Sequence, residues 1–126
     1  MTTVVRLETF ADLDERAGDD PHWVSVSATL SAVLDDGRRV TLLDDRGWSG
    51  TRRWETATAG EIESTTLTVV GPDEPVEGQT HEEVAAAHWA HLAAVLGEGG
   101  VAAGPDTLRA LPHVVVLSDR LRARTA

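Results

Sequence analysis

Residues 22–34, HWVSVSATLSAVL, contain the pattern that decides the fold of this chain. Apolar residues alternate with serine and threonine, which is the two-residue period of a β-strand with one buried and one solvated face. The apolar series comprises Val24, Val26, Ala28, Leu30, Ala32 and Leu34. We therefore expect a sheet that turns one face toward a core and the other toward water.

A hairpin turn is predicted directly after this strand, at DDGR in residues 35–38. A two-residue loop would place Arg39 on the apolar face of the hairpin. A three-residue loop, with Gly37 in the left-handed conformation, keeps apolar residues on that face. Because a shift of one residue turns every side chain to the opposite face, we predict the three-residue loop. The facing pairs are then Ala32 with Val40, and Leu30 with Leu42.

Residues 80–97, THEEVAAAHWAHLAAVLG, have the periodicity of an amphipathic helix. Thr80 and Glu83 have the spacing of a capping box, and Gly97 favours the end of the helix. One side of the predicted helix collects the apolar residues Val84, Ala85, Trp89, Leu92, Val95 and Leu96. We expect this side to pack on one face of the sheet.

Weaker patterns complete the predicted order of elements. They indicate a strand at 3–8, a short helix at 9–17 that begins with Thr9, a loop at 46–54, a strand at 61–70, an acidic linker at 71–79, a helical turn at 104–111, a central strand at 113–117 and a frayed tail at 119–126. Few long crossovers are available, so the sheet should be mostly antiparallel. The prediction is a single α+β domain, 1–126, with two layers, about five strands and one main helix at 80–97.

The composition limits the classes of function. The chain has 126 residues and a formal net charge of −10, with 21 acidic residues against 11 basic ones. This acidity disfavours nucleic-acid binding, which needs excess positive charge, and is compatible with a basic protein partner.

There is no cysteine, which excludes disulfides and thiol catalysis and fits the cytoplasm. We expect no secretory signal, no membrane segment and no cofactor. The lack of Lys, Asn and Tyr indicates a bacterial source of high GC content.

Three histidines on the predicted helix form the first candidate site. His88 lies within the apolar side, His81 lies beside it, and His91 flanks it. Imidazole binds zinc, nickel or copper, and an unperturbed histidine titrates near neutral pH, so these residues are candidates for metal or small-molecule binding. The spacing is not that of HExxH. The alternative is that His88 is a half-buried, hydrogen-bonded core residue with His81 and His91 at its rim.

The segment RGWSGTRRW, residues 46–54, is the second candidate site. Tryptophan and arginine dominate the energetics of protein interfaces, and functional residues are concentrated in loops. We therefore select a binding set of Trp48, Arg52, Arg53 and Trp54. The alternative is that a tryptophan folds back into the core while the arginines balance nearby carboxylates. GWSG does not match the GxSxG nucleophile motif, and no catalytic triad can be assembled.

Acidic pairs recur along the chain and together offer a negative surface to a basic partner. Individually, they fit turns and helix starts, where carboxylates accept hydrogen bonds from backbone amides. The pairs are Asp19–Asp20, Asp35–Asp36, Asp44–Asp45, Asp73–Glu74 and Glu82–Glu83.

The order of these segments resembles that of small bacterial polymorphic-toxin immunity proteins. The matching pieces are FADLDERAG, HWVSVSATL, RGWSG and HEEVAAAHWAHLAAVL, although no single motif is diagnostic. The resemblance implies a non-enzymatic, acidic protein-binding module that neutralises a basic toxin domain. The alternative is a small-molecule or metal-binding protein, or an enzyme, that uses the histidines of helix 80–97. A homodimer formed through the sheet or the tryptophan segment is a third hypothesis.

Overall fold

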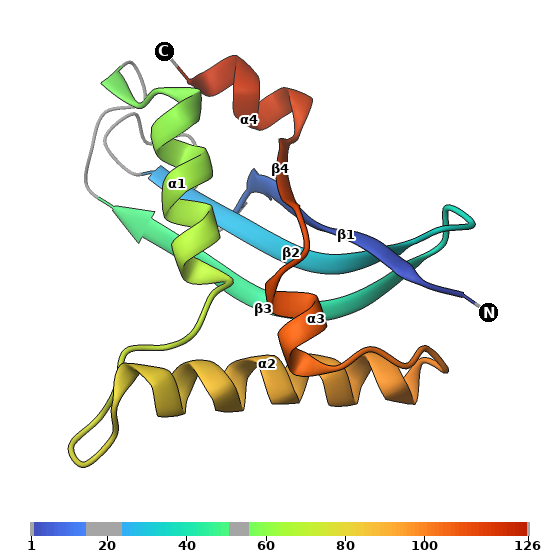
Figure 1. Ribbon diagram of the computed structural model, residues 1–126. Helices are drawn as coiled ribbons and strands as arrows, with labels where there is room; N and C mark the ends of the chain where they lie inside the picture. The colour runs from blue at the N-terminus through green and yellow to red at the C-terminus, as the bar shows by residue number, and fades with distance from the viewer. Residues whose placement is uncertain (1, 15–23, 51–55, 126) are drawn as a thin grey trace.

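The computed structural model describes residues 2–14, 24–50 and 56–125. Within these ranges the chain forms one mixed sheet of four strands and four helices (Figure 1). The strands are β1 (Val4–Leu13), β2 (Val24–Leu34), β3 (Arg39–Gly50) and β4 (His113–Leu117), and the helices are α1 (Ala59–Val69), α2 (His81–Glu98), α3 (Pro105–Arg109) and α4 (Asp119–Arg124). The predicted α+β class is confirmed.

The sheet has the strand order β3-β2-β1-β4. β2 pairs antiparallel with both β1 and β3, whereas β4 pairs parallel with β1. The segment 113–117 was correctly predicted as a strand, but it lies at an edge of the sheet and not in the centre. The described sheet has four strands where about five were expected, and its β1–β4 pair makes it mixed.

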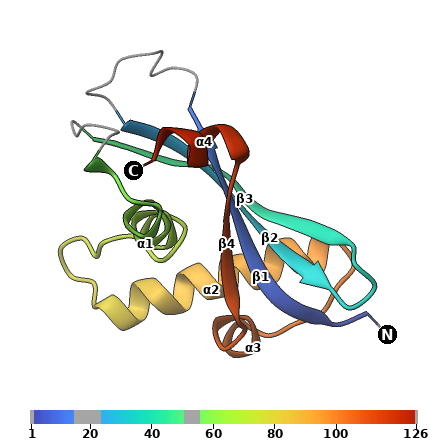
Figure 2. The same ribbon diagram turned by 90° about the horizontal axis from the view of Figure 1, so that it is seen from above.

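The hydrophobic core lies between one face of this sheet and the helices (Figures 1 and 2). In one half, Leu30 of β2 belongs to a buried cluster with Leu92 and Leu96 of α2. In the other half, Val26 of β2 belongs to a cluster with Ile62 of α1. The face is therefore covered by α1 as well as by α2, and the prediction of one main helix was incomplete.

Helix α2 is the element that sequence periodicity predicts best. Thr80 is its N-cap, and the reciprocal capping box with Glu83 is present. The fully buried positions are Leu92 and Leu96, which belong to the predicted apolar side. The helix continues to Glu98 and is capped by Gly99, slightly beyond the expected end at Gly97.

The β2–β3 hairpin follows the predicted loop. Gly37 has a φ of 88°, the left-handed conformation that glycine adopts without a steric penalty. Ala32 faces Val40, as predicted. Leu30 faces Leu43 and not Leu42, because the register shifts on each side of Leu30.

The helix predicted at 9–17 is wrong over its described part. β1 continues through this segment to Leu13, and Thr9 and Ala11 are fully buried against the helices. Thr9 faces Leu30 of β2, and Ala11 faces Ala28. Pairing with two neighbouring strands therefore overrides the local capping signal. Residues 15–17 lie outside the described part.

The strand predicted at 61–70 is also wrong, because α1 occupies this segment. Thr58 caps the helix by accepting a hydrogen bond from the backbone N–H of Glu61 at 3.2 Å. Ile62 and Thr66 are buried four residues apart, which places both on the side of α1 that contacts the sheet. This packing outweighs the strand preference of the β-branched residues.

The segments around β3 and at the C-terminus also differ from expectation. The first part of the predicted loop 46–54 belongs to β3, which extends to Gly50, and residues 51–54 lie outside the described part.

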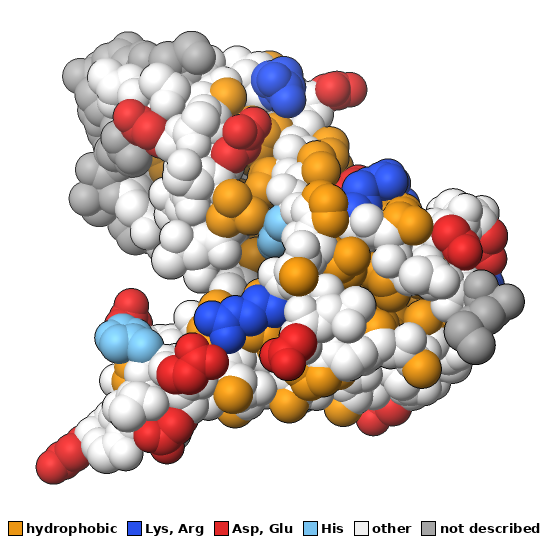
Figure 3. Space-filling model, in the orientation of Figure 1, with side chains coloured by type: hydrophobic (Ala, Val, Ile, Leu, Met, Phe, Trp, Pro, Cys, Tyr) orange, Lys and Arg blue, Asp and Glu red, His pale blue; other side chains and the backbone are white. Residues whose placement is uncertain are grey.

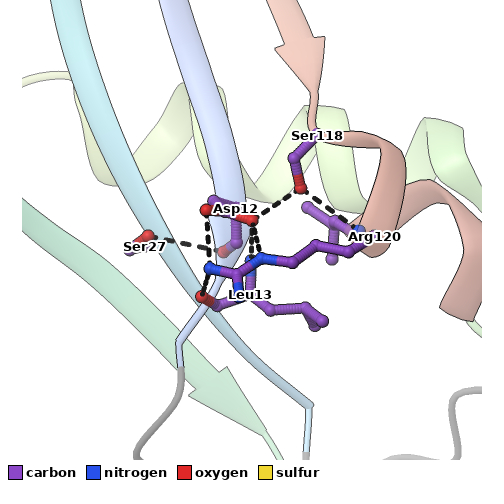
Figure 4. Close-up of polar contacts among 6 residues, drawn as sticks. Asp12, Leu13, Ser27, Ser118 and Arg120 are labelled. Carbon is purple, nitrogen blue, oxygen red and sulfur yellow. Dashed lines mark hydrogen bonds and ion pairs between the residues drawn. The ribbon is translucent and has the colours of Figure 1, made fainter.

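In the predicted frayed tail, residues 119–124 form α4, and Leu121 is fully buried. Ser118 caps this helix, and its hydroxyl also donates a hydrogen bond to Asp12 of β1 (Figure 4).

Candidate functional site

The three candidate histidines have different environments on α2. His81 and His91 are exposed, and His88 is half-buried. The imidazole of His88 makes an edge-to-face contact with Trp89, with ring centroids 5.2 Å apart. Its Nε2 atom is buried and has no hydrogen-bond partner among the described residues. His88 is therefore a half-buried core residue, as in the structural alternative, but one ring nitrogen lacks the expected partner.

The surroundings of His88, first its burial and then the nearby charges, favour a neutral imidazole. Burial lowers the pKa of His88 below its ordinary value of 6.5, and the nearby Arg46 and His91 add to this effect. Asp73 opposes it by raising the pKa. Arg46 is held in place because its Nη1 donates to the backbone oxygen of Val69 at 3.3 Å and to Oδ1 of Asp73 at 3.0 Å.

No group of three or more His, Cys, Asp or Glu side chains suited to a metal ion occurs in the described ranges. His81, His88 and His91 therefore do not form such a group with one another or with the described carboxylates. A structural metal site needs about four ligands, so these histidines would need further ligands from elsewhere.

The side chain of Trp48 makes contacts within the fold. Its side chain is half-buried beside the cluster that contains Val26 and Ile62. Its indole Nε1 donates a hydrogen bond to Oγ1 of the fully buried Thr66 at 3.1 Å. This is the alternative in which a tryptophan of the segment folds back into the core. The other members of the predicted binding set, Arg52, Arg53 and Trp54, lie outside the described residues.

A second partly buried histidine, His113, contacts Thr9, and the sequence patterns did not reveal this contact. Oγ1 of Thr9 and Nε2 of His113 lie 2.6 Å apart, on the paired strands β1 and β4. Burial lowers the pKa of His113 below 6.5. The contact depends on the parallel β1–β4 register across the whole chain, and no local signal in the sequence predicts it.

The most pronounced charged feature is the segment of residues 71–83, which we call the acidic projection. It leads from α1 into the first turn of α2 and protrudes from the molecule (Figure 1). Acidic side chains gather at this end in the space-filling view (Figure 3). All five carboxylates of the segment are exposed: Asp73, Glu74, Glu77, Glu82 and Glu83. Two of the acidic pairs noted in the sequence thus combine into one surface.

The tip of the acidic projection is an ordered turn. The backbone N–H of Gln79 donates to the oxygen of Val76 at 3.0 Å, and the side chain of Gln79 accepts from the N–H of Val76 at 3.2 Å. Gly78, with a φ of 87°, permits the turn. Val76 is 68% exposed, the largest exposed fraction among the large hydrophobic residues described.

Only part of the negative charge of the acidic projection is compensated. Asp73 is paired with Arg46 at 3.0 Å, and Glu82 is paired with Arg109 at 3.1 Å. Glu83 accepts a hydrogen bond from the backbone of Thr80 in the capping box. Glu74 and Glu77 make no ion pair or hydrogen bond with the rest of the described structure. Their carboxylates flank the exposed Val76.

No protein-family model, no curated protein and no solved structure matches this chain. In the described part of the chain, none of the helices combines the length and apolar character needed to cross a membrane.

Proposed function

We propose that this protein is a non-enzymatic, acidic protein-binding module that contacts a basic partner through the acidic projection. One observation carries the proposal: an exposed apolar residue, Val76, stands at the tip of an ordered turn between the uncompensated carboxylates Glu74 and Glu77. Functional contacts are often made by surface loops held on a rigid scaffold. Here α1 and α2 hold the two ends of the turn.

The charge of the whole chain supports the same class of partner. A net charge of −10 attracts a basic protein over long range, and this attraction raises the rate of encounter. Glu74 and Glu77 then face arginine or lysine side chains, while Val76 contacts an apolar group between them. The resemblance to polymorphic-toxin immunity proteins makes a basic toxin domain the specific partner that we propose.

The test begins with native mass spectrometry of the tagged chain recovered from a lysate of its source. We expect a stoichiometric protein partner with a basic isoelectric point. Its association rate is then measured for the wild type and for the Glu74→Gln/Glu77→Gln variant. We expect a drop of about three- to tenfold in the variant, and a fall in the wild-type rate as salt increases, because these charges act mainly on encounter.

A matched control removes the same amount of charge at the other end of the molecule. The Asp35→Asn/Glu98→Gln variant changes two exposed carboxylates, at the β2–β3 turn and at the end of α2 (Figure 1). Its association rate should remain within about twofold of the wild type. Equal effects of the two variants, or a salt-independent rate, would contradict binding through the acidic projection.

A second candidate function is small-molecule or metal binding at α2, and the buried, unpartnered Nε2 of His88 is the observation that favours it. An added ligand would satisfy this nitrogen, because a ring nitrogen without a hydrogen accepts a hydrogen bond or binds a metal. Asp73 and His91, which both act electrostatically on His88, are the candidates for a further ligand. The lack of a three-residue ligand group in the described ranges makes this the weaker proposal.

A further inference from the structure

The outer edge of β4 carries backbone groups available for pairing. The N–H of Leu7 donates to the oxygen of Pro112, and the N–H of Ser118 donates to the oxygen of Ala11, both at 2.9 Å. In a parallel pair with this register, Val114 and Val116 direct their peptide groups toward β1. The N–H and C=O groups of the alternate residues, 113, 115 and 117, therefore point away from the sheet. No described strand lies on that side.

The side chains next to this edge are apolar and exposed. Val114 is 44% exposed and Val116 is 37% exposed, although both belong to a sheet. Phe10, which faces Val116 on β1, is 44% exposed. These three residues lie on the face of the sheet opposite to the core. Figure 3 shows hydrophobic side chains along β4 on the visible surface.

The opposite edge of the sheet differs in character. β3 carries the charged run Asp44, Asp45 and Arg46, and its pairing with β2 shifts register twice. Charges and irregular pairing are the usual devices that prevent a strand edge from joining another strand. β4 has neither charge nor proline within His113–Leu117, and its register with β1 is continuous.

We propose that β4 pairs antiparallel with β4 of a second copy of this chain, so that two four-stranded sheets join across a two-fold axis at Val115. This inference is independent of the proposed function, because it involves neither the acidic projection nor its partner. In the pair, Val115 faces its own equivalent. Val114 faces Val116 of the second copy, and His113 faces Leu117 of the second copy.

A second copy fits this edge because the centre of β4, Val114–Val116, has the same sequence in both directions around Val115. The outward peptide groups occur at the centre and two residues to each side, which is the spacing of an antiparallel hydrogen-bonded pair. The exposed valines occur one residue to each side. A two-fold axis requires such self-complementarity, and strand addition at a sheet edge is a common form of association.

The distribution of charge permits this association in a strongly acidic chain. The two copies meet along an uncharged strand, away from most of the negative charge. Antiparallel pairing brings α4, which follows β4, toward α3 of the second copy, which precedes β4. The ends that meet are the start of α4, with Asp119 in its first turn, and the end of α3, with Arg109 in its last turn. These two residues have opposite charges, so the helix ends do not repel each other.

The first measurement is the mass of the full chain in solution by light scattering, from low to high micromolar concentration. We expect a dimer with twice the 13.5 kDa mass of the chain. Amide exchange followed by NMR should show slower exchange at 113, 115 and 117 as the dimer forms. Val114 and Val116, already bonded to β1, should not change. A monomer at all concentrations, or a dimer without this alternation, would overturn the proposal.

Charge substitutions test the orientation of the pair. In Val114→Lys/Val116→Lys, each introduced lysine faces a lysine of the second copy, and the dimer dissociation constant should rise by at least about tenfold. In Val114→Lys/Val116→Glu, antiparallel pairing places lysine opposite glutamate, so the dimer should recover. A parallel pair would not give this recovery. Dimerisation that survives the double-lysine variant would place the interface elsewhere and overturn the proposal.

The control is Val76→Lys, which introduces one lysine, half of the charge that the double-lysine variant adds, at an exposed valine of the acidic projection. It should leave the dimer dissociation constant within about twofold of the wild type. Circular dichroism identifies any variant that fails to fold. In that case the amide-exchange pattern of the wild-type chain still decides the proposal.

Discussion

The guanidinium of Arg120 in α4 binds the carboxylate of Asp12 in β1 through both oxygens. Nε donates to Oδ1 at 2.7 Å, and Nη2 donates to Oδ2 at 2.8 Å (Figure 4). The backbone N–H of Leu13 and the hydroxyl of Ser118 donate to the same carboxylate. The contacts from Ser118 and Arg120, made across more than one hundred residues, hold α4 against the end of β1.

The Asp12–Arg120 contact predicts a stability change with a defined pH range. The hydrogen bonds from Arg120, followed by those from Ser118 and Leu13, lower the pKa of Asp12 from 3.8 to about 2. Because the folded-state pKa is depressed, the stabilisation is present above pH 3.8 and is lost as the pH falls toward 2. We expect Asp12→Asn to lower the free energy of unfolding by about 1–2 kcal/mol at neutral pH, since Arg120 is half-exposed and water screens the pair.

Urea unfolding at neutral pH and at about pH 2 measures this effect, because the difference between wild type and Asp12→Asn should shrink in acid. Arg120→Gln removes the other partner of the contact. Arg122→Gln is its matched control, since Arg122 is exposed on the same helix. The control should change stability by less than about 0.5 kcal/mol. Equal losses for the two arginine variants would show that the contact with Asp12 is not specific.

Trp48 should contribute to folding and not directly to binding. Its indole donates to the buried Thr66, so removing either group leaves the other without its partner. We expect Trp48→Phe and Thr66→Val each to lower the free energy of unfolding by about 1 kcal/mol. A double-mutant cycle should give a coupling energy of about 0.5–1.5 kcal/mol. A coupling energy near zero would mean that the indole and the hydroxyl do not interact in solution.

Gly47 is required by the close approach of β3 to β2. A Cβ atom at this position would lie 2.9 Å from the backbone oxygen of Val26, which cannot move without disturbing the strand. We expect Gly47→Ala to lower the free energy of unfolding by about 1–3 kcal/mol in thermal or urea unfolding. Gly50→Ala in the same strand is the control, because a Cβ there meets nothing within 4 Å. The prediction fails if both alanine variants are equally stable.

The sequence predicts the elements whose pattern is long and self-consistent. The alternation extends over all of β2, and the helical periodicity extends over several turns of α2. Both elements were predicted correctly. The loop at Gly37 was predicted because only one loop length keeps the apolar residues on one face. These features depend on neighbouring residues in the chain, which is why a single sequence contains them.

The errors occur where distant contacts determine the structure. Thr9 resembles a helix cap, but its position between β2 and β4 fixes it in a strand. The threonines of α1 resemble a strand, but Thr66 is buried and accepts a hydrogen bond from Trp48. The hydrogen bond of Trp48 could not be predicted for the same reason, because its acceptor, Thr66, lies on another element. In contrast, the acidic pairs that combine in the acidic projection were visible in the sequence, although their position was not.

The burial of His88 predicts a loss of stability in acid at a higher pH than for Asp12, and a variant at this position also tests the metal-binding alternative. Its folded-state pKa lies below 6.5, so the neutral form is favoured on folding. The corresponding stability is present above pH 6.5 and is lost as the pH falls through this value toward the lowered pKa. We expect His88→Leu to flatten the dependence of unfolding free energy on pH in this range. His113, whose pKa is also lowered by burial, should account for the remaining slope.

His88→Leu also separates the two interpretations of the unpartnered Nε2 of His88, a buried structural nitrogen or a metal ligand. Leucine removes a buried polar atom that has no hydrogen-bond partner in the described structure, so His88→Leu should match or exceed the wild type in stability at pH 7. His81→Gln, at an exposed position, is the control and should resemble the wild type in stability at pH 7. Thermal unfolding with added Zn²⁺ completes the test. We expect no rise in the midpoint of the wild type. A rise that disappears in His88→Leu would instead establish a metal site on α2, because a ligand that binds only the folded state stabilises it.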